Sequence, residues 1–329
     1  MNTRRRLFIV LGVGALATPL ISFAQQQTGK IFRIGLLSPF SPSATASWHQ
    51  ALRLGLRDLG WIEGQNISIV YRYADGRSDR LPELAADLVH QKVDVIVAAL
   101  VIDAVAAKEA TSTIPIVVAS AGDPVALKVV ESEARPGGNV TGLSQISIEL
   151  VGKRLELLKE VVPNLSRVAV LWDPQNPVST LNWKEIQIPA QQLGVQLHSL
   201  EVSSTNDFDK AFEDATKTRA GALAVMPAPL FAGNFKRIAD LAAKTRLPSI
   251  FQFSEFTDAG GLLAYGPDRS DMFRRAAAYV DKILKGAKPG DLPMERPTKF
   301  ELVINMKTAK TLRITLPNTI LLRATRVIE

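Results

Sequence analysis

The sequence predicts an α/β protein with two lobes, each built on a parallel β-sheet that helices cover. Short runs rich in Val and Ile alternate with amphipathic helical stretches from Ile31 onward. Strands separated by helices are expected to be parallel, because a crossover helix returns the chain to the same end of the sheet. This array occurs twice over similar lengths, and 329 residues exceed one ordinary hydrophobic core. Two similar, Rossmann-like lobes are therefore expected.

The first array is expected between residues 32 and 144. Apolar residues three and four positions apart, such as Leu52, Leu56 and Leu59, indicate its helices. Its strands are predicted at 32–38, 66–73, 93–99, 115–120 and 139–144, and its helices near 44–60, 79–91, 102–112 and 124–133.

The stretch RPGGNVTG, residues 135–142, interrupts this alternation. A Gly pair lets the backbone turn sharply, whereas Val140 and Thr141 favour an extended chain. The stretch is interpreted as a turn followed by a short strand that leads from one lobe into the other. An alternative, glycosylation of Asn139 within Asn-Val-Thr, suits a eukaryotic secreted protein, and the rest of the sequence has a bacterial character.

The second array repeats the pattern. After a helix near 147–162, strands are predicted at 167–173, 195–202, 222–227, 248–253 and 261–266, with helices at about 178–193, 206–218, 231–246 and 269–286. Several Gly and Pro residues then precede KFELVINMKTAKTLRITLP, which is interpreted as one more strand and a short helix.

The first 24 residues have the order of a signal peptide. Arg4, Arg5 and Arg6 precede an uncharged apolar run that ends in Ser-Phe-Ala, and Pro19 argues against a permanent membrane span. We expect cleavage after Ala24 and a periplasmic protein. The paired arginines also resemble a twin-arginine signal, so both export routes stay open.

Charge and cysteine content exclude several classes. The formal charge of +7 falls to +4 once the three arginines of residues 1–24 are removed, and the other cations alternate with acids along helices. Nucleic acid is therefore not an expected partner. The chain has no cysteine, so neither a disulfide framework nor a lipid-modified cysteine anchor is expected.

Catalytic and metal-binding patterns are not recognisable. His49, His90 and His198 stand alone on predicted helices or strands, and no His-Glu-x-x-His motif, Gly-x-Ser-x-Gly elbow or phosphate-binding loop occurs. The sequence predicts no enzyme activity, metal or cofactor.

Polar, small and aromatic residues recur just after the predicted strands, where parallel sheets bind ligands. Each residue alone fits a turn or a helix cap equally well, but the pattern in both lobes predicts a cleft. The candidate ligand-binding residues are Ser38, Ala99, Leu100, Ser120, Gly122, Asp123, Trp172, Asp173, Asn176, Pro227 and Phe253.

Several of these segments carry a family resemblance. The segments IGLLSP, TSTIPIVVASAGDPV, ARPGGNVTGLS, AVLWDPQNP and GGLLAYGPD, with the export signal, resemble exported substrate-binding proteins of ABC transporters, and more narrowly the group that binds tryptophan and other aromatic amino acids. The resemblance implies a type I periplasmic-binding-protein fold, with three crossing strands and the ligand between the lobes. It places the crossings at 139–144, Ser254–Asp258 and Arg296–Phe300, and the lobes at 31–143 with 257–294 and at 144–256 with 295–329.

One loop departs from that group. Amino-acid-binding members usually have Gly followed by Ser or Thr after the third strand, whereas this chain has Ala98-Ala99-Leu100-Val101-Ile102. Apolar contacts and a more hydrophobic or aromatic ligand are therefore expected there. Asp123 is the candidate partner for an ammonium or hydroxyl, and Trp172 and Phe253 are candidate stacking surfaces.

The resulting prediction is a monomeric periplasmic protein that captures a small organic ligand and delivers it to a membrane ABC permease, without a permanent membrane anchor. A sensor that signals to a membrane receptor is the alternative, followed by an enzyme on the same fold. The sequence leaves the ligand open.

Overall fold

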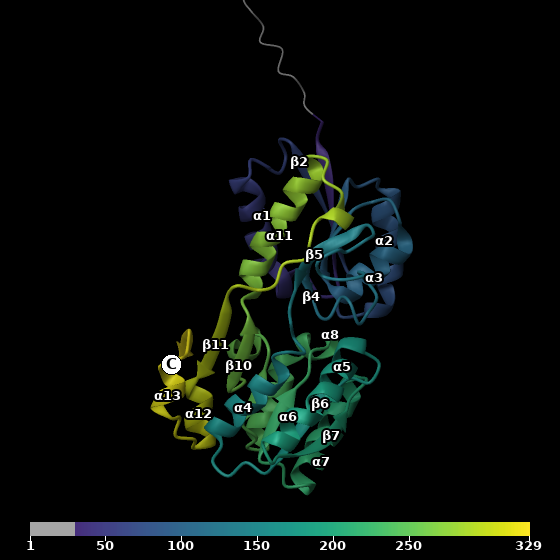
Figure 1. Cartoon of the computed structure of the whole chain (residues 1–329). Helices are drawn as coiled ribbons and strands as arrows, with labels where there is room; N and C mark the ends of the chain where they lie inside the picture. The colour runs from purple at the N-terminus through teal and green to yellow at the C-terminus, as the bar shows by residue number, and fades with distance from the viewer. Residues whose placement is uncertain (1–29) are drawn as a thin grey trace, which may run out of the picture. The chain divides into compact units, whose positions relative to one another are not determined.

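The computed structural model describes residues 30–329, and the expected signal peptide at 1–24 lies outside this part. Within residues 30–329 the strands form two sheets, of order β2-β1-β3-β4-β5 and β12-β11-β10-β9-β8-β6-β7. Helices lie on both faces of each sheet (Figure 1). The predicted α/β class with two lobes is confirmed.

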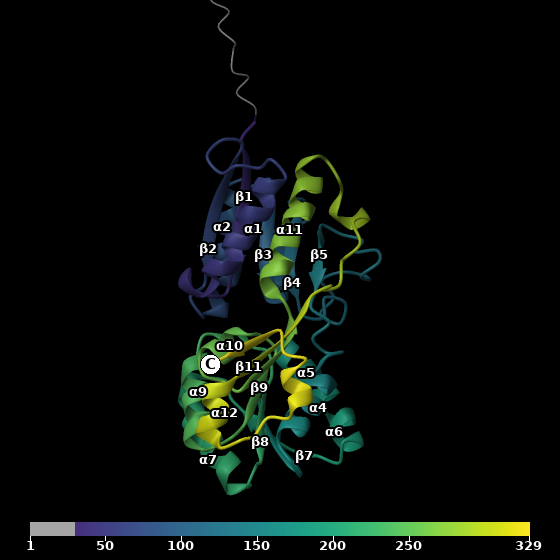
Figure 2. The same ribbon diagram turned by 90° about the vertical axis from the view of Figure 1, so that its left-hand side faces the viewer.

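The first lobe consists of the first sheet and the helices that pack on it. All its strand pairs are parallel. Helices α1 and α11 lie together on one face, and α2 and α3 on the other (Figure 2). The elements are β1 (Phe32–Ser38), β2 (Ile67–Tyr73), β3 (Val95–Leu100), β4 (Ile116–Ala121), β5 (Val140–Ser144), α1 (Ala46–Asp58), α2 (Leu81–His90), α3 (Val101–Ala110) and α11 (Arg269–Leu284), with 3-10 turns η1 (Ser43–Thr45), η2 (Ser78–Arg80) and η4 (Pro289–Asp291).

Strand β3 shows why this sheet is buried on both faces. Val95, Val97 and Ala99 pack into the cluster beneath α1 and α11. Ile96 and Ala98 pack into the cluster beneath α2 and α3. Successive side chains of a strand point to opposite faces, so a continuous apolar run fills both layers.

The second lobe consists of the second sheet and its helices. Helices α4 to α6 lie on one face, and α7 and α9 on the other (Figure 2). Its strands are β6 (Arg167–Trp172), β7 (Gln196–Glu201), β8 (Ala222–Val225), β9 (Ser249–Phe251), β10 (Leu263–Pro267), β11 (Phe300–Asn305) and β12 (Arg326–Ile328). Its helices are α4 (Val151–Val161), α5 (Pro177–Glu185), α6 (Gln187–Gln192), α7 (Phe208–Lys217), α8 (Pro229–Ala232), α9 (Phe235–Lys244), α10 (Glu255–Asp258), α12 (Met306–Leu312) and α13 (Asn318–Leu321), with the 3-10 turn η3 (Thr205–Asp207).

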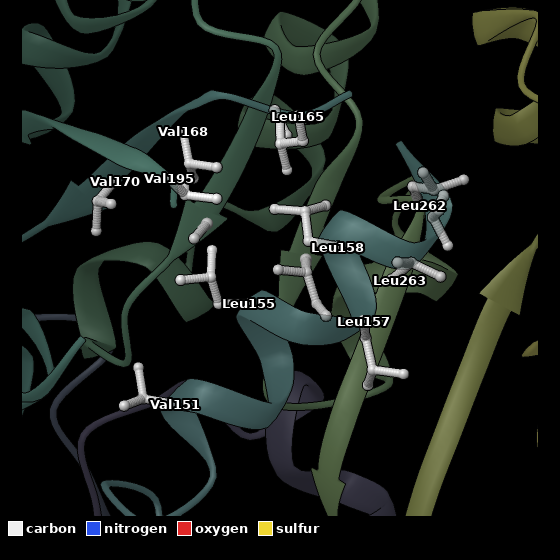
Figure 3. Close-up of a cluster of buried hydrophobic side chains, with 14 of the residues drawn as sticks. Val151, Leu155, Leu157, Leu158, Leu165, Val168, Val170, Val195, Leu262 and Leu263 are labelled. Atoms are coloured by element: carbon white, nitrogen blue, oxygen red, sulfur yellow. The ribbon is translucent and has the colours of Figure 1, made fainter. Parts of the chain in front are cut away.

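Helix α4 contributes much of the core on its face of the second sheet. Leu155 and Leu158 point toward Val168 and Val170 of β6 in Figure 3, and all four side chains are buried. The spacing of three between the two leucines keeps both on one side of the helix.

The second sheet is not parallel throughout. β10 and β11 pair antiparallel, with Pro267 opposite Phe300. The chain leaves the second lobe after β10, passes through α11 and returns at the start of β11, so the outgoing and returning strands run in opposite directions. This pair is the exception to the expected parallel order.

The lobe boundary expected at Ser254–Asp258 does not coincide with the place where the chain passes from the second sheet to the first lobe. Residues 255–258 form α10, and the chain continues into β10, which pairs with β9 and β11 in the second sheet. The passage to the first lobe lies between Pro267 and Arg269. The sequence pattern of β10 predicted a strand, but such a pattern does not show which of the two sheets the strand joins.

The expected helix at 124–133 is also absent, and the chain forms turns there. Asp123 and Lys128 have left-handed backbones, with φ of 50° and 54°. A non-glycine residue in that conformation interrupts an α-helix.

Strand β5 starts after the turn at Gly137, as RPGGNVTG predicted, with φ of 83° at that glycine. Its end pairs with the segment that returns to the second lobe, since Ser144 N donates to Glu295 O at 2.9 Å and Glu295 N donates to Gly142 O at 3.0 Å. Two of the passages between lobes are thus bonded to each other.

Candidate functional site

A cavity with an empty volume of about 430 Å³ lies at the carboxyl ends of strands from both lobes. The cavity is lined by Phe40, Leu100, Val101, Ile102, Ser120, Gly122, Gln145, Asn176, Val178, Pro227, Ala228, Pro229, Ala232, Phe251, Gln252, Phe253 and Arg269.

The start of α3 forms an apolar part of the wall. Leu100, Val101 and Ile102 line the cavity where β3 passes into the helix. Asp103, fully buried in this first turn, accepts a hydrogen bond from Leu100 N through Oδ2 at 2.8 Å. Burial raises the pKa of the Asp103 carboxyl well above its ordinary value. Asp103 therefore engages the N–H of the residue that precedes the helix, and the N-cap residue Leu100 itself offers no side-chain hydrogen bond to the helix.

Two glutamines and a serine supply amide and hydroxyl groups. Gln145 Nε2 donates to Ser120 O at 2.8 Å and to Ser120 Oγ at 2.6 Å, which fixes both side chains at the ends of β4 and β5. Gln252 follows β9, and its buried Oε1 has no hydrogen-bond partner within residues 30–329. This oxygen remains able to accept a hydrogen bond.

The first turn of α5 adds a further polar group. Asn176 Oδ1 accepts a hydrogen bond from Ser179 N at 2.9 Å and so caps the helix, and the same residue lines the cavity. Val178 lies beside it on the cavity wall.

The cation of the site is Arg269, the first residue of α11. Its side chain is 5% exposed, and its guanidinium carbon lies 4.2 Å from the ring centre of Trp48 and 3.4 Å from that of Phe253. Glu255 Oε1 is 3.6 Å from Nη1 and accepts a hydrogen bond from Trp48 Nε1 at 2.8 Å. Burial lowers the pKa of Arg269 to about 10, so the side chain stays cationic at neutral pH.

Six of the candidate residues line this cavity: Leu100, Ser120, Gly122, Asn176, Pro227 and Phe253. They come from the carboxyl ends of strands in both lobes, as the sheet rule leads one to expect. Their contact with a ligand stays a prediction.

Three candidates belong to the protein interior. Ser38 Oγ accepts a hydrogen bond from Phe40 N at 3.3 Å, and Ala99 packs beneath α1 and α11. Trp172 stacks on Trp183 with ring centres 5.4 Å apart and donates to Ser199 Oγ at 2.7 Å. Trp172 is therefore a core residue and not the expected stacking surface of the cleft.

The two aspartates lie outside the cavity. Asp123 Oδ1 accepts a hydrogen bond from Ala126 N at 3.0 Å and borders a separate groove with Arg296. Asp173 Oδ1 accepts from Gln175 N at 2.8 Å and borders an adjoining, more open hollow. Both carboxylates stabilise local turns, which is the role that the sequence left open as the alternative to ligand contact.

The sequence interpretation missed Phe40, Gln145, Gln252 and Arg269. Gln145 follows β5 and Arg269 follows β10 by two residues, so the rule of looking after each strand would have found both. Phe40 and Gln252 similarly follow β1 and β9.

The three histidines lie elsewhere. His49 is buried and hydrogen-bonds Tyr73 Oη at 3.1 Å, while His90 Nδ1 lies 2.9 Å from Ala86 O; neither lines the cavity, nor does His198. In the described residues, no group of three or more His, Asp or Glu is arranged to hold a metal ion, and no helix of that part is long and apolar enough to cross a membrane.

Comparison with known proteins agrees with this architecture. Residues 33–328 match the family described as ABC transporter substrate binding protein. A tyrosine-binding protein from Clostridioides difficile is 27% identical over 261 residues, which cover 78% of this chain and 74% of that protein.

Two solved structures have the same fold over most of the chain. A conserved domain protein from Vibrio cholerae superposes with a TM-score of 0.85 at 28% identity, covering 91% of this chain and 100% of the other. An ABC domain from Streptococcus pneumoniae, solved in complex with L-Trp, also gives 0.85 at 25% identity, with the same coverage.

The family match spans nearly all of the described residues, and the cavity lies where the two lobes of such proteins meet. This chain belongs to the family of ABC transporter substrate binding proteins and is a solute-binding component that captures a small ligand.

Proposed function

We propose that the protein works in the periplasm and binds one small organic molecule with a largely apolar or aromatic body in the cavity between its lobes. It then delivers this molecule to a membrane ABC permease. The observation that carries the proposal is the lining of the cavity. Apolar side chains from both lobes, Leu100 and Ile102 on one side and Pro227 and Phe253 on the other, surround a few fixed polar groups.

The relatives support this assignment. The tyrosine-binding protein and the structure with L-Trp are named for aromatic amino acids. The apolar start of α3 suits such a ring. The polar groups of Ser120, Gln145 and Gln252 suit a ligand that carries few hydrogen-bonding atoms.

The proposed mechanism is a population shift between open and closed arrangements of the lobes. Moving from almost always open to almost always closed takes about 10⁴-fold preference for the closed form, roughly 5.5 kcal/mol. A micromolar ligand binds with about 8 kcal/mol, which is enough.

Small molecules released from purified protein and identified by mass spectrometry would test the proposal. The extracted ligand should be a small, largely apolar compound. Added back, it should reduce the radius of gyration in small-angle scattering and raise the melting temperature with the logarithm of its concentration. A protein that yields no ligand, and that no small molecule compacts or stabilises, would contradict the proposed function.

A further inference from the structure

Arg269 brings buried N–H donors, which have no hydrogen-bond partner within residues 30–329, into the wall of the cavity. Its Nε and Nη1 atoms are buried and have no hydrogen-bond partner among the residues that the structure describes. The Glu255 carboxylate lies 3.6 Å from Nη1, close enough to form an ion pair but beyond hydrogen-bonding distance. Buried guanidinium donors without partners are costly, so a group that pairs with them would be bound strongly.

The two aromatic rings fix how this cation is presented. Trp48 comes from α1 of the first lobe and Phe253 from the segment just after β9 in the second, and the guanidinium lies over both. A planar guanidinium held by stacking keeps its N–H fork in one orientation, which suits the two oxygens of a carboxylate.

The start of α3 is the other place where the cavity could hold an anion. The start of α3 points to the cavity, but the Asp103 carboxyl takes the Leu100 N–H. An acid group there would find the Leu100 N–H already engaged, although the N-cap residue Leu100 offers no side-chain hydrogen bond to the N–H groups of the first turn. Within the described part of the chain, Arg269 is the cationic side chain of the cavity lining.

A positively charged group on the ligand finds no such partner. None of the side chains that line the cavity in residues 30–329 is acidic. Glu255 does not line it, and one of its oxygens receives the Trp48 indole N–H while the same oxygen faces Arg269. Among the lining side chains that the structure describes, an ammonium would have only neutral acceptors such as Gln252 Oε1.

We propose, building on the proposed function, that the ligand is an aromatic or other apolar carboxylate without an α-ammonium group, whose carboxylate pairs with Arg269. This class differs from the free amino acids in the names of the relatives. Its apolar body lies against Leu100, Ile102 and Phe253, and a hydroxyl or ring N–H donates to Gln252 Oε1.

A matched series of probes tests this on the wild-type protein by calorimetry. Three probes share one carbon skeleton: indole-3-propionate, indole-3-propionamide and L-tryptophan. The amide lacks the negative charge of indole-3-propionate, and L-tryptophan adds only an α-ammonium group to it. We expect indole-3-propionate to bind at least about 10-fold more tightly than either of the others. The amide loses a charged hydrogen bond to Arg269, and L-tryptophan brings an ammonium charge without a partner.

Variants assign the preference to Arg269. Arg269→Gln should weaken indole-3-propionate binding by about 10- to 100-fold and leave indole-3-propionamide nearly unchanged. Arg269→Lys should recover part of the preference, since it keeps the charge without the planar fork. Arg274→Gln is the matched control, because Arg274 lies on the same helix and forms an exposed ion pair with Asp58.

Equal binding of the acid and the amide, tightest binding of L-tryptophan, no binding of any probe at millimolar concentration, or an unchanged Arg269→Gln variant would each overturn the inference. The wild-type series decides the question even where that variant fails to fold. An extracted ligand that is neutral or cationic would overturn the carboxylate class and leave the proposed function standing.

Discussion

Replacing Gly142 by alanine should destabilise the protein strongly, because this glycine lies where β5 leaves the first lobe. Its φ is 138°, a conformation that side chains with a Cβ rarely adopt. A Cβ placed there would lie 2.0 Å from the Val118 carbonyl oxygen and 2.8 Å from its nitrogen. Both are backbone atoms of the neighbouring strand β4, so no side-chain rotation relieves the contact.

The expected loss can be worked from these contacts. The backbone conformation costs about 1–3 kcal/mol for a residue other than glycine. Moving β5 away from β4 also weakens the bond from Glu295 N to Gly142 O, and a hydrogen bond contributes about 0.5–1.5 kcal/mol. With the steric overlap, Gly142→Ala should lose about 3–5 kcal/mol, a large share of a typical stability of 5–15 kcal/mol.

Gly138→Ala is the matched control, because a Cβ there meets no atom within 4 Å and the backbone is not left-handed. It should change stability by less than about 1 kcal/mol. Urea unfolding followed by circular dichroism measures the stability of both variants. The dependence of the unfolding free energy on urea concentration should be the same in both, which shows that unfolding exposes the same amount of surface. A Gly142→Ala variant that unfolds at the same urea concentration as Gly138→Ala would refute the reasoning.

Three further predictions concern single side chains. Burial, and secondarily the charge of Arg53, lowers the pKa of His49 from 6.5 to about 4, so the folded protein favours the neutral histidine. The free energy of unfolding should therefore fall by up to about 3 kcal/mol as the pH drops from 6.5 to 4. Urea unfolding of the His49→Gln variant should not show this fall. Burial raises the pKa of Asp103, so the contribution of this carboxyl to stability is full below pH 3.8 and is lost as the pH rises through the raised pKa. The Asp103→Asn variant should therefore gain stability relative to the wild type with increasing pH. A difference in stability that does not depend on pH would contradict this. Asp123→Ala should lower the melting temperature and leave calorimetric affinity for the extracted ligand unchanged, whereas Asn176→Ala should reduce both; an affinity loss in Asp123→Ala would show that the turn carboxylate reaches the ligand.

Periodicity in the sequence predicted most of the fold because the apolar layers leave a direct pattern. The run Val95 to Ala99 alternates between two cores, and the same rule explains the misassignment of Trp172. Trp172 shares its face of β6 with Val168 and Val170, so counting by twos from either valine would have placed it in the core. Its position next to a turn drew attention away from that face.

The site was only half predictable for a different reason. Leu100 and Ser120 lie at the carboxyl ends of β3 and β4 and could be found from local pattern alone. The environment of Arg269 depends on Trp48 and Glu255, which approach it only when segments far apart in the sequence fold together. The position after β10 marks Arg269 as a candidate, but no local pattern shows that its side chain is buried against these two residues.

In the proposed mechanism, the position of Arg269 connects recognition with movement of the lobes. It follows the passage out of β10 by two residues, and its guanidinium contacts Trp48 of the first lobe and Phe253 of the second. An arrangement that separates these rings leaves the cation with one aromatic partner and a more hydrated fork, which weakens its pairing with an anion. A ligand can shift the lobes only by binding one arrangement more tightly than another. The proposed carboxylate, paired with Arg269, would meet that condition directly, because the guanidinium contacts rings from both lobes.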